Sequence, residues 1–289
     1  MKEINAKKNN VGEKNNKKKI LVIILVSLLV VGGGLTLYFT IIKPHNLAVE
    51  EYNKVVSVIN DENKELDEHI KKVESLIDSK DKVIDETVIT NAKEATKKAG
   101  AEKLIVKKRP FKTSEIKKDT EKYSTPPDYS ENIKLLDEAY NAYDRSIKQY
   151  KQMTNPSADF VIQRLKTVDE VVDARAVTED NDPNGKLNKA GGYTATVYFE
   201  SKNVNQENWM GEDLIEKGTA AGGAIEVYPN EEDAIKRRDY LSGFDGSILS
   251  NGTHTVVGTV LIRTSDELSA SKQKELERKV IDALTRLED

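Results

Sequence analysis

The hydrophobic and polar positions divide the chain into three stretches with different patterns. Residues 20–42 form an uninterrupted apolar run with no charge, directly behind a basic tail, residues 1–19. A helix over this run spans roughly 35 Å at about 1.5 Å per residue, which matches the hydrocarbon core of a bilayer. The pattern therefore predicts a transmembrane helix at Ile20–Ile42, with the lipid bilayer as its partner.

The charges around the apolar run predict its orientation. Residues 1–19 hold seven Lys and two Glu, a net charge of +5. Because Lys and Arg stay on the cytoplasmic side of a span, we expect a cytoplasmic N-terminus and an extracellular region from residue 43 to 289. The run is longer than the core of a cleaved signal peptide and ends without an Ala-x-Ala site, which favours an uncleaved signal anchor in the cell membrane.

Residues 43–153 show a helical heptad pattern on a polar background. Two seams of core positions occur, at Tyr52, Val56, Ile59, Asn63, Leu66, Ile70, Val73 and Ile77, and at Ile133, Leu136, Tyr140, Tyr143, Ile147 and Tyr150. Such helices need a partner for their narrow apolar stripe. We expect a coiled-coil-like antiparallel hairpin within one monomer, with a homodimer through the stalk as the alternative. The polar Asn63 is expected to fix the register in either arrangement.

The connector between the two seams, residues 100–127, is basic and contains helix breakers. It holds eight basic and four acidic residues, and Pro110, Pro126 and Pro127 interrupt it. This composition fits contact with anionic wall polymer or lipid headgroups. It also fits a solvated connector at the tip of the hairpin.

From residue 154 to 289 the pattern changes to an α+β domain. Strand patterns occur at 193–199, 224–228 and 255–262, the last apolar on both faces, as in a central strand. Helical patterns follow residues 155–157 and cover 231–241 and 269–287, the second of these capped by Asn230. About three strands and three helices predict a two-layer α+β fold.

Charge and cysteine content exclude several classes of function. Residues 154–289 hold 16 basic and 25 acidic residues, a net charge of −9, which argues against nucleic acid as a partner. The chain contains no Cys, so disulfides, thiolate zinc sites and cysteine nucleophiles are excluded. An exported protein without disulfides fits the surface of a Gram-positive cell.

One loop carries a metal-like pattern. Asp180, Asp182, Asn184 and Gly185 match the opening of a calcium loop, in which alternating oxygens and a glycine wrap a hard cation. Position twelve of that loop, where a bidentate Glu belongs, is Gly191. Because Asp-Pro-Asn-Gly is also a turn sequence, a structural turn is the alternative to a calcium site.

Three segments of the C-terminal region carry a family resemblance. They are Thr-Glu-Asp-Asn-Asp-Pro-Asn-Gly at 178–185, Gly-Thr-Ala-Ala-Gly-Gly-Ala-Ile-Glu-Val-Tyr at 218–228, and Gly-Thr-His-Thr-Val-Val-Gly-Thr-Val-Leu-Ile-Arg-Thr at 252–264. They resemble a group of uncharacterised membrane-anchored proteins of Firmicutes, labelled EbhA-like. The resemblance covers about residue 155 to the end. It implies a recurring extracellular module, with no activity and no functional residue to transfer.

These patterns predict a membrane-anchored cell-surface protein that binds a partner or cell-envelope component without catalysis or cofactor. Trp209 and Met210, in a predicted loop, are candidates for the partner contact. A calcium-stabilised binding module is one alternative. An extracytoplasmic cell-wall hydrolase that uses carboxylates such as Asp180 and Asp182 is another, although no nucleophile motif supports it.

Overall fold

The computed structural model describes residues 2–205, 211–246 and 252–288, with side chains from residue 17 onward. The chain divides into two compact units. Unit 1 consists of Met1–His69 and Lys98–Ile133, and unit 2 consists of Ile70–Lys97 and Lys134–Asp289. The division falls inside three long helices, whereas the sequence suggested a stalk that ends near residue 153.

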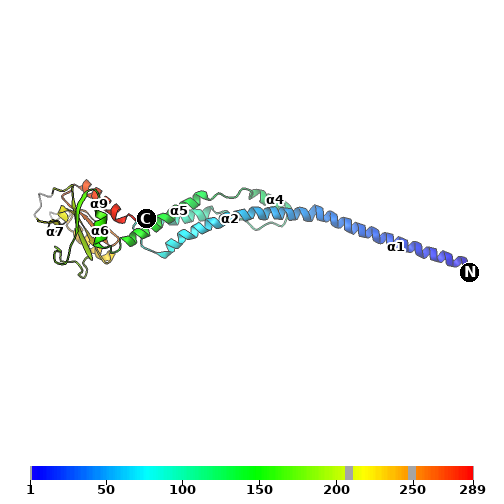
Figure 1. Ribbon diagram of the computed structural model, residues 1–289. Helices are drawn as coiled ribbons and strands as arrows, with labels where there is room; N and C mark the ends of the chain where they lie inside the picture. Colours follow the sequence, from blue (N-terminus) through cyan, green and yellow to red (C-terminus); the bar gives the residue numbers. More distant parts are fainter. Residues whose placement is uncertain (1, 206–210, 247–251, 289) are drawn as a thin grey trace. The chain divides into compact units, whose positions relative to one another are not determined.

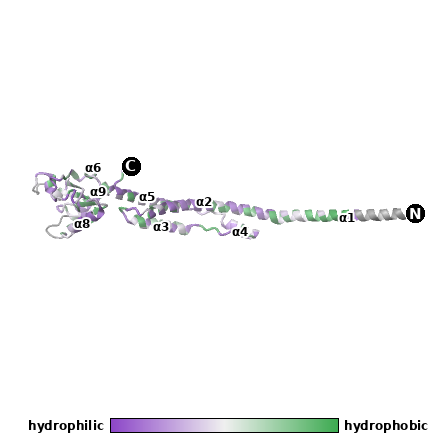
Figure 2. Cartoon of the chain, turned by 90° about the horizontal axis from the view of Figure 1, so that it is seen from below, coloured by the Kyte–Doolittle hydropathy of each residue, from purple (hydrophilic) through white to green (hydrophobic). Residues whose placement is uncertain are grey.

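Unit 1 contains the apolar run as a continuous helix. Helix α1 (Lys2–Leu37) passes through a π-helical turn, η1 (Tyr38–Ile42), into α2 (Lys43–Ser79) without a break (Figure 1). Figure 2 shows the hydrophobic stretch of α1 giving way to mainly hydrophilic residues along α2. Among the described residues, Lys17–Ser79 is the one helical stretch long and apolar enough to cross a membrane.

The remainder of unit 1 packs against the first half of α2. It contains the end of α3 (Thr87–Glu102), an extended segment, α4 (Thr113–Lys122) and the start of α5 (Ser130–Gln152). The core of this unit consists of Ala48, Tyr52, Ile59, Ile116 and Tyr123. Because α3 brings the chain back, the 100–127 connector lies along the start of α2 and is not the tip of a two-helix hairpin.

Asn63 is the polar residue of the first seam, and both polar atoms of its side chain are hydrogen-bonded within unit 1. Its Nδ2 donates to the Leu104 carbonyl at 2.9 Å, and its Oδ1 accepts from the Tyr129 hydroxyl at 2.9 Å. The same hydroxyl accepts from the Leu104 amide at 2.7 Å. Asn63 therefore fixes the register of the returning segment, rather than that of a second seam helix.

In unit 2 the seam helices run in the same direction, so the expected antiparallel pairing is wrong. Lys72 lies over the ring of Tyr140, and ten residues later Lys82 lies over Tyr150, at 4.3 and 5.5 Å from the ring centroids. Lys82 lies three residues beyond the end of α2, so the contacts advance together along α5 and along α2 with the segment that follows it. The reason is that α2 ends at Ser79, just before Lys80 with its φ of +54°, and α3 supplies an intervening return leg.

Unit 2 also contains a five-stranded antiparallel sheet in the order β1-β2-β3-β5-β4. The strands are β1 (Val171–Ala176), β2 (Ala195–Ser201), β3 (Gly222–Val227), β4 (His254–Val257) and β5 (Val260–Thr264). The accompanying helices are α6 (Ala158–Leu165), α7 (Leu214–Lys217), the 3-10 helix η3 (Gly218–Ala221), α8 (Glu231–Ser242) and α9 (Ala270–Thr285). The α+β class is confirmed, and five strands replace the expected three.

Two local features explain the strands that the pattern did not reveal. The edge strand β1 carries the charged residues Asp173 and Arg175, which break its apolar character. The apolar stretch 255–262 is a hairpin rather than one central strand. Gly258 turns it with a φ of +62°, and a Cβ there would lie 2.6 Å from the Met153 carbonyl oxygen, so glycine is required.

Side chains of the central strands are buried on both faces of the sheet. On one face, Val197, Ile225 and Ile262 belong to a core shared with α6 and α9. On the other face, Tyr198 and Leu261 belong to a core shared with α7 and α8. The expected two-layer arrangement is therefore wrong: the apolar residues at both alternations of these strands require helices on both sides.

Candidate functional site

A buried charge cluster lies within the sheet on its α8 side. Glu226 of β3 is completely buried, and the pairing of Ala224 with Arg263 of β5 places Arg263 diagonally beside Glu226 on the same face. Arg263 Nη1 donates to Glu226 Oε1 at 2.8 Å. Helix α8 contributes Arg237, whose Nε donates to Oε2 at 3.1 Å, and the Tyr228 hydroxyl donates to the same oxygen at 2.7 Å.

The cluster holds one carboxylate and two guanidinium groups. Burial alone would raise the pKa of Glu226, but the charges of Arg263 and Arg237 and the hydrogen bond from Tyr228 hold it below its usual value. Burial raises the pKa of Tyr228, and the negative charge of Glu226 raises it further. At neutral pH Glu226 is therefore ionised and Tyr228 is protonated, and these four groups together carry a charge of +1.

A cavity of about 500 Å³ opens beside this cluster. Tyr193, Tyr228 and Tyr240 line it together with the neighbouring α8 residues Lys236 and Arg237. Tyr240 is 60% exposed, and the guanidinium of Arg237 lies 5.6 Å from the centroid of its ring. The volume and the mixture of aromatic surface with a few polar groups are typical of small-ligand sites. We call this cavity the tyrosine pocket.

The residues of the tyrosine pocket suit binding better than acid–base chemistry. Arg237 reaches from the buried cluster to the pocket, with 23% of its side chain exposed, and offers a fixed planar cation. Lys236 also lines the pocket but forms ion pairs with Glu232 and Asp233. Among the described residues that line the pocket, Asp233 is the one carboxylate, whereas glycoside hydrolysis requires a pair.

The loop with the calcium-like pattern forms a wall of the tyrosine pocket. Asp182 accepts four hydrogen bonds: Oδ1 from the Tyr193 hydroxyl at 2.5 Å and the Asn184 amide at 3.1 Å, and Oδ2 from the amides of Lys186 and Leu187 at 2.6 and 2.9 Å. Burial raises the pKa of the Asp182 carboxyl, but these donors outweigh burial and lower it. In this arrangement Asp182 organises the turn and holds Tyr193 in place.

Two other residues of the calcium-like pattern, Asn184 and Asp180, have different surroundings. The Asn184 side chain donates to the Tyr198 hydroxyl at 3.3 Å and lines the tyrosine pocket, whereas Asp180 is exposed. In the described parts of the chain, no group of three or more His, Asp or Glu side chains is placed to hold a metal ion together. The structure therefore supports a turn at this loop, and its calcium binding stays a prediction.

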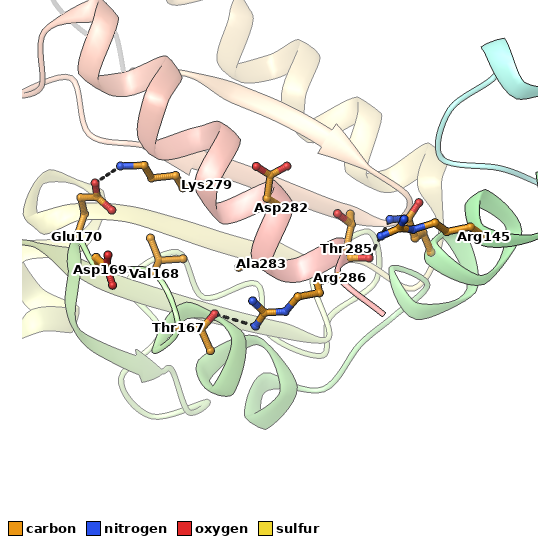
Figure 3. A pocket seen from close by; sticks show the side chains of 11 residues that line it. Arg145, Thr167, Val168, Asp169, Glu170, Lys279, Asp282, Ala283, Thr285 and Arg286 are labelled. Atoms are coloured by element: carbon orange, nitrogen blue, oxygen red, sulfur yellow. Dashed lines mark hydrogen bonds and ion pairs between the residues drawn. The ribbon is translucent and has the colours of Figure 1, made fainter. Parts of the chain in front are cut away.

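A second groove in unit 2, of about 540 Å³, lies between α5, the segment after α6 and the C-terminal half of α9 (Figure 3). Most of its polar groups are already engaged with one another. Lys279 binds Glu170, and Arg286 donates to the Thr167 hydroxyl at 3.3 Å. It has few apolar and no aromatic side chains among its described lining residues, so we regard the tyrosine pocket as the stronger ligand site.

Trp209 and Met210, the predicted partner contacts, lie outside the described residues. The buried cluster, in contrast, escaped the sequence analysis although a signal for it was present. Glu226 and Arg263 are single charges of opposite sign inside two otherwise apolar strands. Charges in such positions need a buried partner, and the two strands could have been paired on that ground.

The chain was compared with family models, with curated proteins and with solved structures, and none of the three comparisons finds a match. The resemblance to EbhA-like proteins of Firmicutes therefore stays a prediction.

Proposed function

We propose that this chain is a single-pass membrane protein whose C-terminal region, residues 154–289, binds an anionic ligand of the cell envelope in the tyrosine pocket. The binding is non-catalytic. The observation that carries the proposal is the shared buried carboxylate. The guanidinium groups of Arg263 and Arg237 both bind the carboxylate of Glu226. Arg237 also extends to a cavity lined by aromatic rings.

The chemistry of the pocket indicates the class of ligand. An anionic group beside Arg237 would balance the residual charge of the cluster. The exposed ring of Tyr240 offers a flat apolar surface for a ring-shaped moiety. An acidic or phosphorylated sugar unit combines both features. Residues 154–289 are acidic overall, so most of their surface would repel an anionic ligand. The cations of the pocket therefore favour binding of such a ligand at this place.

Binding is tested by calorimetry on the full chain in detergent, with glucuronic acid and glucose 6-phosphate as probes and glucose as the neutral comparison. Tyr240→Ala removes an exposed ring and should weaken binding of the acidic probes by about tenfold, a loss of about 1.4 kcal/mol. Arg238→Gln is the matched control, because Arg238 pairs with Asp239 and does not line the pocket. Equal affinities in both variants, or no binding of any acidic probe, would exclude this ligand class.

The anchor and its orientation form the second half of the proposal. The charge-free run, the basic tail before it and the exposed apolar side chains within Ile20–Ile42 support it. Since the chain has no Cys, a maleimide label can be assigned to the single cysteine that a variant introduces. A membrane-impermeant maleimide applied to intact cells should label Lys202→Cys and leave Lys14→Cys unlabelled. The reverse pattern would invert the orientation, and recovery of the chain in the soluble fraction would remove the anchor.

A further inference from the structure

Unit 1 has a strongly basic surface close to the end of the proposed transmembrane helix. We define the basic return segment as residues 107–118, which follow α3 and run into α4. Its six basic residues and one acidic residue give a net charge of +5, with the cations at Lys107, Lys108, Arg109, Lys112, Lys117 and Lys118. Its position in unit 1 and its surface chemistry together indicate what it contacts.

The end of the apolar helix has the residues expected at a membrane–water interface. Tyr38 and Phe39 are exposed, and the Lys43 ammonium lies 5.6 Å from the centroid of the Phe39 ring. Aromatic rings with a neighbouring cation are typical of the headgroup level. This reading rests on the proposed single-pass anchor, and it places the interface at about residues 38–43.

Three hydrogen bonds show that the chain returns along α2 toward this interface. Asn63 bonds the Leu104 carbonyl, the Tyr52 hydroxyl donates to the Lys107 carbonyl at 3.1 Å, and His45 Nδ1 lies 2.9 Å from the Thr113 hydroxyl, to which it is hydrogen-bonded. Asn63 and His45 stand 21 and 3 residues beyond Ile42, or about 32 Å and about 5 Å along the helix. Thr113 is therefore within one helical turn of the end of the apolar run.

Next to Thr113, the Phe111 side chain is 86% exposed. A large aromatic residue with so little protein contact, surrounded by cations, has the composition of a membrane-surface element rather than of a core. Among the described residues, Lys112 is the one cation of the basic return segment with an ion-pair partner, Glu115 at 3.4 Å. The other five cations are thus available to external anions.

We propose that the basic return segment binds the surface of the bilayer in which α1 is anchored. Phe111 inserts at the level of the headgroups, and the surrounding Lys and Arg side chains bind anionic lipid headgroups. The observations favour lipid over a soluble acidic partner, because the contact of Thr113 with His45 brings the segment back to the interface marked by Tyr38 and Phe39. Contact at this second point would hold the first turns of α2 against the membrane surface.

The test uses single-cysteine variants of the full chain, labelled with an environment-sensitive fluorophore and reconstituted into vesicles. Phe111→Cys is compared with Ile105→Cys, which is almost equally exposed at 82% but lies next to Leu104, beside Asn63 and far from the interface. In vesicles that contain phosphatidylglycerol, we expect a blue shift at residue 111 and quenching by doxyl lipids. Residue 105 should show neither. The double variant Lys108→Gln/Arg109→Gln should weaken the response, whereas the charge-matched Lys97→Gln/Lys98→Gln should leave it unchanged.

The outcomes separate the proposed lipid contact from the proposed anchor. A label at Leu28→Cys, within the apolar run, should be quenched in every vesicle if the anchor is correct. Quenching at residue 28 without any at residue 111 would overturn the lipid contact and leave the anchor standing. Equal responses at residues 111 and 105, or a response at 111 that follows added acidic polymer rather than anionic lipid, would also overturn it.

Discussion

Arg263 Nη1 donates to Glu226 Oε1 at 2.8 Å, with 6% and 0% of the two side chains exposed. Removal of the charge of Glu226 would leave two guanidinium groups without a counter-ion in a buried site. We expect Glu226→Gln to lower the free energy of unfolding of unit 2 by about 3–5 kcal/mol. Urea unfolding of the full chain in detergent, followed by near-UV circular dichroism, measures this change.

The control for this variant is Glu232→Gln. Glu232 pairs with Lys236 at the surface, where 78% and 64% of the two side chains are exposed. Exposed pairs contribute about 0–1 kcal/mol, so this variant should unfold close to the wild-type midpoint. Similar losses in the two variants would show that Glu226 does not hold the cluster together.

Acid should destabilise unit 2 through Glu226 and Asp182. Both carboxyls have a folded-state pKa below the ordinary value, so their stabilisation is present above the unfolded-state pKa of about 4 and is lost as the pH falls below it. We therefore expect the urea midpoint to be level from about pH 7 to 5 and to fall below about pH 4. In Asp182→Asn this fall should be shallower, and an unchanged slope would contradict the assignment for Asp182.

Two carboxylates of one loop should differ sharply in their effect on stability. Asp182 serves four donors, whereas Asp180 is exposed. We expect Asp182→Asn to lower the free energy of unfolding by about 1–3 kcal/mol and Asp180→Asn to change it by less than about 0.5 kcal/mol. Thermal unfolding gives both values. If calcium raises the wild-type midpoint relative to EDTA and Asp180→Asn abolishes that rise, the loop is a calcium site after all.

Replacement of Asn63 should loosen the return of the chain in unit 1. Asn63→Leu would leave the Leu104 carbonyl and the Tyr129 hydroxyl without their partner, so amide hydrogen exchange should accelerate around residues 103–107. Asn60→Leu on the exposed side of the same helix is the matched control. Equal exchange rates in the two variants would mean that Asn63 does not fix this register.

Local patterns predicted the elements whose environment is uniform along the sequence. The apolar run of α1 is readable because no charge interrupts it, and the seam residues Tyr52 and Ile59 are buried as their heptad spacing indicates. Likewise, the Asn230 side chain accepts from the Asp233 amide at 2.9 Å and caps α8 as expected. In each case the pattern that indicates the element lies within one short stretch of sequence.

Features that depend on distant residues were harder to predict. The second helical layer depends on which face of the sheet each helix covers, and the sequence pattern of a helix does not show this. Heptad spacing likewise does not encode the parallel course of α2 and α5. The tyrosine pocket brings Tyr193, Tyr228 and Tyr240 together from three separate segments. The position of its Arg237 side chain depends on Glu226, which lies eleven residues away in the chain. Such a site becomes visible only once the strand register is known.

The π-helical turn at Tyr38–Ile42 has a rotational consequence. The Lys43 amide bonds the Tyr38 carbonyl five residues earlier, so the turn holds one residue more than an α-helical turn. One residue corresponds to about 100° of helix rotation. The turn therefore sets the direction around the helix axis in which His45 meets Thr113 of the returning chain, relative to the side chains of α1. Rotation of α1 about its own axis would be transmitted through this turn. It would change the direction in which Phe111 points.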